Sequence, residues 1–305
     1  MRRQAVAAAS EEAAREAAQA YLDAGGDAIG AVVSGFFAAA GDSPGVLFGA
    51  VGLIVAQVGV GTRAFDGRLR QPGLGQRRPR GLAADEVVPA AARVGAPSGV
   101  SAVLVALRYG RSAALSKVLA SGIGLAKKAG CERRAEALEA FERLGPAALS
   151  SPGISRPLIH RAGPSEGGAL GVGDLEFIPE LDHPARARDD VRVPPWEGER
   201  FDPVFVSASE WQDRANRQHG ICASDVGGGL AALCYDNVGT GLHIDELELV
   251  LPLDAVPTRR GLPRIAPGRF LPAPMPIAIA VSASDVPLEA TVALAEGAPL
   301  RVVAV

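Results

Sequence analysis

The sequence predicts an α+β fold in which helices pack on β-sheets, with a helix-rich first two-thirds and a strand-rich last third. Helical patterns that end in glycine fill the first part, for example over 27–40 and 132–144. A strand, a glycine turn and a second strand follow over 218–237, which reads QHGICASDVGGGLAALCYDN. Short apolar runs between 247 and 305 predict further strands.

The amino-acid composition excludes some classes of function for this chain. The chain has 305 residues, a net charge of -3 and 5% aromatic residues, so we expect no basic surface for nucleic acid and a core of small aliphatic side chains. Its three cysteines, Cys131, Cys222 and Cys234, include no CxxC pair, and their odd number argues against a disulfide framework. Cys222 and Cys234 could still face each other across the predicted hairpin.

The most hydrophobic run, 45–61, is marginal for a membrane span because glycines and one glutamine interrupt it. A buried pair of strands or a core helix fits this run better. No secretory signal precedes it, since the N-terminal region has the pattern of an alanine-rich helix rather than a continuous apolar segment. We therefore expect a cytoplasmic protein without a membrane span.

The first two helices have clear boundary signals. Ser10-Glu11-Glu12 predicts a helix start, and Gly25-Gly26 predicts its end after Asp23. The second helix, 27–40, is apolar nearly all round, which places it inside a layered core. Its small residues permit the close approach of a neighbour, and we also expect such Ala/Gly-rich helices to supply an oligomer interface.

The segment 66–80, DGRLRQPGLGQRRPR, predicts a loop with five arginines. This loop is either an anion-binding site, with Arg68 as the candidate residue, or a solvated loop. Strands are expected between 46 and 65, and helices over 98–109, 112–129 and 132–144. The remaining expectations are a loop with one short helix over 150–173, an exposed charged linker over 182–202 and a strand over 203–209.

Several segments, taken in order, resemble the γ-glutamyltransferase (γ-glutamyl transpeptidase) family of N-terminal-nucleophile (Ntn) hydrolases. The matching segments are GGDAIG at 25–30, FDGR at 65–68, VGAPSG at 94–99, GGAL at 167–170 and IAPGR at 265–269, with Met275 beyond them. The resemblance implies an αββα sandwich and one domain over 1–305. Within it, 1–181 would correspond to the family's large subunit and 203–305 to its small subunit, joined by the linker 182–202.

The resemblance fails where the family's chemistry lies. The family's small subunit begins with a threonine that cuts its own preceding peptide bond, in a motif T-T-H-x-S-V-V-D before a glycine turn. Aligning that motif with Asp225 places Gln218 at the nucleophile position, and glutamine has no hydroxyl for this reaction. Cys222 could serve as nucleophile only if the register shifted. The family's serine pair aligns with proline and alanine at 272–274, and the chain is shorter than family members usually are.

We therefore expect a non-catalytic γ-glutamyltransferase-like protein that is a structural or regulatory subunit of an oligomer or complex. One alternative is an active γ-glutamyl hydrolase or transpeptidase acting on glutathione-like substrates through Cys222. Another is a small-molecule binder in which Arg68 holds a γ-glutamyl or other anionic ligand, as its counterpart in the family holds the glutamyl α-carboxylate. No cofactor is expected, and no metal either, because no second histidine cluster follows His243.

Overall fold

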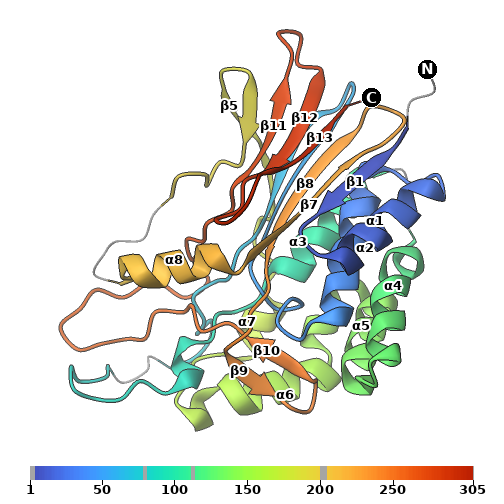
Figure 1. The fold of residues 1–305 in the computed structure, drawn as a ribbon. Coiled ribbons are helices and arrows are strands. Elements are labelled where there is room, and N and C mark those ends of the chain that lie inside the picture. Colours follow the sequence, from blue (N-terminus) through green and yellow to red (C-terminus); the bar gives the residue numbers. More distant parts are fainter. Residues whose placement is uncertain (1–3, 78–80, 111–113, 200–204, 305) are drawn as a thin grey trace.

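Two antiparallel sheets lie face to face, and the helices cover the outer face of the larger one (Figure 1). The fold is that of a computed structural model, which describes residues 4–77, 81–110, 114–199 and 205–304. The larger sheet has the order β1 (Val6–Ala9), β7 (Gln218–Ser224), β8 (Leu230–Asp236), β2 (Val51–Gln57), β3 (Gly61–Gly67), β4 (Asp182–Pro184). The smaller has the order β13 (Leu300–Val303), β12 (Pro287–Val292), β11 (Ile277–Val281), β6 (Val191–Val193), β5 (Arg186–Arg188), and β9 (Leu242–Ile244) pairs with β10 (Leu249–Leu251).

The helices confirm the expected α+β class. The described α-helices are α1 (Glu12–Asp23), α2 (Ala28–Asp42), α3 (Gly99–Ala106), α4 (Leu115–Lys128), α5 (Glu132–Leu144), α6 (Pro152–Ala162), α7 (Val172–Glu176) and α8 (Ala208–Asn216). Short 3₁₀ turns join them: η1 (Ala90–Arg93), η2 (Leu107–Tyr109), η3 (Gly145–Ser150) and η4 (Pro164–Glu166). None of the described helices is long and apolar enough to cross a membrane.

The hydrophobic run that was marginal for a membrane span forms the central strand β2. Alternate side chains of a strand point to opposite faces, so Leu53 and Val55 pack toward the helices while Ile54 and Ala56 pack toward the second sheet. Both faces are buried, which explains why the run shows no polar alternation. The core therefore consists of one layer between the helices and the larger sheet and another between the two sheets.

Helix α2 is buried on all sides, between α1, α4 and the strands β7 and β8. A Cβ added at Gly41 of α2 would lie 2.1 Å from the carbonyl oxygen of Gly122 in α4, so only glycine permits this approach. The expected close neighbour is thus α4 of the same chain.

The hairpin predicted over 218–237 is present, with β7 and β8 in continuous register. Asp225 fixes its turn, since the Asp225 carboxylate accepts hydrogen bonds from the amides of Gly227 (2.7 Å) and Gly229 (3.1 Å). It also accepts one from the amide of Ala28 at the start of α2 (3.1 Å), which ties the turn to the helical layer. Val226, between Asp225 and the glycines, lies in the turn and is 54% exposed.

The segment expected to be an exposed linker, 182–202, instead contains β4, β5 and β6. Strand β4 pairs with β3 in the larger sheet, and β6 pairs with β11 in the smaller one, so this segment joins the two sheets. Each strand has three residues, too few to show a hydrophobic period, and neighbours far away in the sequence supply their hydrogen bonds. Residues 200–202 of the segment lie outside the described residues.

The helix expected within 150–173 is present as the eleven-residue α6, which continues through Pro157. The next segment differs from its expectation. The strand expected over 203–209 is not present in its described part, because Ser207 caps α8 there, and 203–204 lie outside the described residues. The side chains of Ser207 and Glu210 form a reciprocal capping box, a signal that the sequence carried as S-x-x-E.

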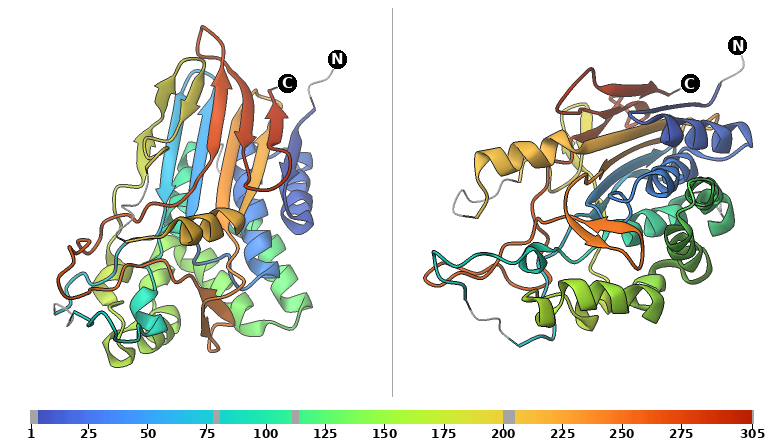
Figure 2. Two further views of the ribbon diagram at one scale, coloured as in Figure 1. Left: turned by 60° about the vertical axis from the view of Figure 1, so that its left-hand side comes forward. Right: turned by 60° about the horizontal axis from the view of Figure 1, so that its bottom comes forward.

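In the described part of the chain, no helical layer covers the outer face of the smaller sheet (Figure 2). Ile277, Ile279 and Val281 of β11 point inward and are buried, so the alternate Ala278 and Ala280 point outward. The described layers are therefore, in order, a layer of helices, the larger sheet and the smaller sheet.

Candidate functional site

The candidate site lies at the end of the larger sheet where strand β7 begins and strand β8 ends. Gln218 is the first residue of β7 and pairs with Asp236, the last residue of β8. Arg68 directly follows β3, whose last residue, Gly67, is level with Val51 in the register of β2. Gln218 and Arg68 thus lie at the same end of the sheet. Three strand-to-strand spacings separate them, which is ~14 Å across the sheet.

Gln218 is buried, with 5% of its surface exposed, and both ends of its carboxamide have hydrogen-bond partners. The Nε2 group donates to Oδ1 of Asp236, and Oε1 accepts from the thiol of Cys234. A carboxamide has separate donor and acceptor groups, so Gln218 satisfies the carboxylate of Asp236 and the thiol of Cys234 together. The position that resembles the family's nucleophile is therefore occupied by a buried side chain engaged in the sheet.

A buried network of two acids and two arginines continues from Asp236. Arg217 contacts Asp236 (Nη2 to Oδ2, 3.3 Å) and also Asp254, while Arg214 lies 3.4 Å from Asp254. Burial raises the pKa of Asp236 to about 6, against the opposing effect of Arg217. Burial disfavours the charged form of Arg217, but Asp236 and Asp254 raise its pKa above the ordinary value. The four side chains balance in formal charge, so the network can be buried without a net charge.

The main chain enters this site from a helix. Helix α8 ends at Asn216, Arg217 caps it, and β7 begins at the next residue. Trp211 of α8, Trp196 and Met275 line a cavity of about 210 Å³. Neither tryptophan was predictable from the sequence as part of a site, because no motif surrounds either one.

Arg68 lies next to Trp196 and is only 4% exposed. Its Nε and Nη2 donate to the two oxygens of Asp66 at 2.9 and 2.8 Å, and Nη1 donates to Glu199 at 2.6 Å. Burial opposes its charge, but these two carboxylates raise its pKa above the ordinary value. Its guanidinium also faces the rings of Trp196 (5.3 Å) and Phe270 (5.5 Å). Arg68 is therefore not part of a solvated loop, and internal acids occupy the donors that a ligand carboxylate would need.

The thiol of Cys222 is fully buried between the two sheets. Burial raises its pKa to about 12, so it is protonated at neutral pH. Its Sγ lies 3.8 Å from the carbonyl oxygen of Leu300. All three cysteines are free, and the described residues contain no group of three His, Cys, Asp or Glu side chains that could hold a metal ion.

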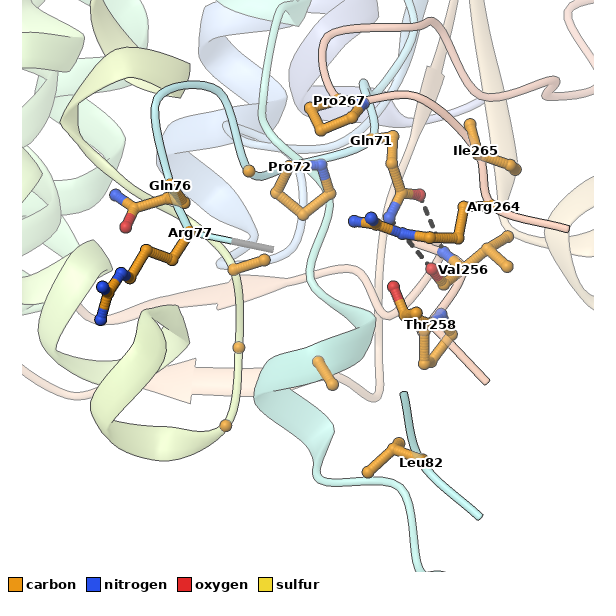
Figure 3. Close-up of a pocket in the computed structure, with 16 residues that line it drawn as sticks. Gln71, Pro72, Gln76, Arg77, Leu82, Val256, Thr258, Arg264, Ile265 and Pro267 are labelled. Carbon is orange, nitrogen blue, oxygen red and sulfur yellow. Dashed lines mark hydrogen bonds between the residues drawn. The ribbon is translucent and has the colours of Figure 1, made fainter. Parts of the chain in front are cut away.

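A second cavity, of about 230 Å³, lies where two segments of the family resemblance, 167–170 and 265–269, meet (Figure 3). Its walls come from 71–77, from the glycine turn at 167–169 and from 256–267. The carboxamide of Gln71 is bonded twice to the backbone of Val256, at 3.0 and 3.1 Å, which fixes one wall. The side chain of Arg264 extends toward Gln71 in Figure 3, and its Nε has no hydrogen-bond partner.

Comparison with solved structures identifies the fold. LmbA2991HD aligns with a TM-score of 0.66 and 14% identity over 95% of this chain and 78% of that one. Cephalosporin acylase from Bacillus halodurans aligns with a TM-score of 0.66 and 14% identity over 95% of this chain and 77% of that one. γ-Glutamyltranspeptidase from Helicobacter pylori aligns at 20% identity over 56% of this chain and 62% of that one, with a TM-score of 0.45.

The sequence matches no protein-family model and no curated protein. Identities of 14% establish likeness of fold alone, and that likeness extends over nearly the whole chain. The arrangement of helices and antiparallel sheets agrees with it. The chain therefore has the Ntn-hydrolase fold of the cephalosporin acylase, as the resemblance of its segments predicted.

Proposed function

We propose that this chain is a non-catalytic protein on an Ntn-hydrolase scaffold, acting as a structural or regulatory subunit rather than as an enzyme. The observation that carries the proposal is Gln218 at the first position of β7, where the resemblance places a threonine nucleophile. Glutamine has neither a hydroxyl nor a thiol to attack a carbonyl group. Its side chain is instead buried and hydrogen-bonded to Asp236.

The chemistry of self-cleavage supports the same proposal. In an N-terminal nucleophile the α-amine released by self-cleavage is the base for its own side chain. Gln218 has no side-chain nucleophile with which to cut the bond that precedes it, so it cannot release such an amine. A substitute nucleophile would have to be Cys222, which is buried between the sheets and protonated.

The decisive experiment is an intact-mass measurement combined with a hydrolysis assay. We expect one species near 31.2 kDa and no turnover of a γ-glutamyl anilide. Two fragments that sum to this mass would contradict the proposal. So would turnover that a Cys222→Ser variant loses, because that result would assign the role of nucleophile to Cys222.

The subunit role is supported by the outer face of the smaller sheet. No described helical layer covers it, and it presents Ala278, Ala280 and the 61% exposed Val303 beside the ion pair of Glu289 and Arg301. A sheet face that mixes small apolar and charged side chains can pack against a second protein surface. We expect self-association in sedimentation that Ala280→Glu weakens and that the remote Ala208→Glu does not. A monomer at every concentration, in extract as well as after purification, would contradict the subunit role.

A further inference from the structure

Arg70, two residues after Arg68, has a different environment from Arg68. Its guanidinium is 1% exposed and has no carboxylate partner among the described residues. Nε donates to the hydroxyl of Ser98 at 2.8 Å, and Nη2 donates to the carbonyl oxygen of Asp174 at 2.7 Å. Nη1 is buried and has no hydrogen-bond partner. A buried, charged donor without an acceptor is costly, so this group is expected to have a partner in the functioning protein.

The carboxylate of Asp174 does not fill this role, because backbone amides already occupy it. Asp174 accepts from the amides of Gly73, Leu74 and Gly171, each at 3.0 Å. Burial lowers the pKa of Arg70 to about 10, partly offset by the charge of Asp174. Arg70 therefore remains cationic at neutral pH, with one donor unsatisfied.

Arg70 lines a cavity of about 160 Å³ between the start of α3, η3 and the end of α7. Ser98 and Ser101 of α3 line it as well, and both are nearly fully buried. The Ser98 hydroxyl accepts from Arg70 and makes no capping bond to its own helix, so its proton is free to be donated. The first amides of α3 add the positive end of a helix dipole. The polar end of the cavity thus offers several donors of positive or partly positive character.

The rest of the lining is mainly apolar. It includes Leu149, Leu175, Phe177 and Ile178, and the last two are 46% and 56% exposed. The ring of Phe177 lies over the Arg70 guanidinium, with its centroid 5.2 Å from Cζ, and leaves Nη1 without a hydrogen-bond acceptor. The rim also includes the exposed carboxylate of Glu176, which disfavours a ligand with two negative charges. At ~30 Å³ for each water molecule, the volume equals about five waters, so roughly six non-hydrogen atoms fit.

From these observations we infer that the cavity beside Arg70 binds a small monocarboxylate with a short apolar chain. The carboxylate lies against Nη1 of Arg70 and the hydroxyl of Ser98, and the chain lies against Leu149 and Phe177. The site is separate from Arg68, whose three side-chain nitrogens each donate to Asp66 or Glu199. It requires no reaction at Gln218 and would bind its ligand in a non-catalytic protein.

Calorimetric titration of the full-length chain with sodium butyrate tests the inference, with 1-butanol and inorganic phosphate as comparison ligands. We expect butyrate to bind with a Kd on the order of 1 mM and the other two at least ~10-fold more weakly. Butyrate that fails to bind would show that water alone fills the cavity, which overturns the inference. Equal binding of butanol or of phosphate would overturn the choice of a monocarboxylate.

Variants locate the site. Arg70→Met is expected to abolish butyrate binding. Because this variant loses two buried hydrogen bonds, Ala147→Leu provides an independent test: Ala147 is exposed at the cavity wall, and the larger side chain fills the space without changing Arg70. We expect Ala147→Leu to weaken butyrate binding at least ~10-fold, and the matched Ala208→Leu, exposed on α8, to leave it unchanged. Unchanged binding in Ala147→Leu would place the ligand elsewhere and overturn the inference.

Discussion

Nε2 of Gln218 donates a hydrogen bond to Oδ1 of Asp236, its partner across the β7–β8 ladder. The residue that stands at the nucleophile position is therefore part of a buried structural network. The network extends through Arg217 to Asp254 and Arg214. A substitution of any one of these side chains should therefore change the free energy of unfolding.

Asp236→Asn should flatten the dependence of stability on pH. The native pKa of Asp236 is about 6, above its ordinary 3.8, so the native state binds more protons than the unfolded state between these values. Stability therefore falls as pH rises through this window, by at most ~3 kcal/mol from this group. Urea unfolding at several pH values should show this slope in the natural chain and lose it in Asp236→Asn. The exposed Asp245→Asn is the control, and equal slopes in all three chains would contradict the prediction.

Arg68→Leu should destabilise the chain by ~3–5 kcal/mol, because it leaves the buried carboxylate of Asp66 unpaired. Adding Asp66→Asn should recover part of this loss by removing the uncompensated charge. The control is Arg15→Leu, whose partner Glu12 is exposed, and it should change stability by less than ~1 kcal/mol. Chemical denaturation measures all three. A loss for Arg68→Leu as small as that of the control would mean that the Arg68–Asp66 pair is solvated.

Two glycines in α4 should respond oppositely to alanine. A Cβ at Gly122 would lie 2.1 Å from the carbonyl oxygen of Phe37 in α2, so Gly122→Ala must separate the helices and should cost at least ~1–3 kcal/mol. Nothing lies within 4 Å of a Cβ at Gly124, so Gly124→Ala should stabilise α4 by ~0.5–1 kcal/mol. Thermal unfolding distinguishes them. Similar effects of the two variants would mean that α2 and α4 do not pack this closely.

The three thiols should react with Ellman's reagent in a fixed order. Cys131 is partly exposed and should react first in the native protein. Burial raises the pKa of Cys222 to about 12 and that of Cys234 well above its ordinary value, so both should react only on unfolding. A Cys131→Ser variant isolates the two slow thiols. Fast native labelling of Cys222 in that variant would support Cys222 as a nucleophile.

The sequence by itself determined the elements whose signals are local. The hairpin over 218–237 was predictable from an apolar run on each side of a glycine turn, and α1, α2 and α5 were predictable from apolar periodicity and terminal glycines. The order of short family-like segments predicted the fold, and the spacing to Asp225 placed Gln218 at the start of β7. The hairpin and the helices needed only neighbours within about twenty residues, whereas the family resemblance needed the order of segments along the chain.

Only the tertiary structure decided which side chains meet. The strands β4, β5 and β6 are too short to have a period of their own, and they form because β3 and β11 supply their partners. Arg68 and Arg70 look alike in the sequence, yet Arg68 is paired with Glu199, 131 residues away, while Arg70 faces a cavity. The physical reason is that burial and pairing depend on the distance between segments in space, which the local pattern of a sequence does not specify.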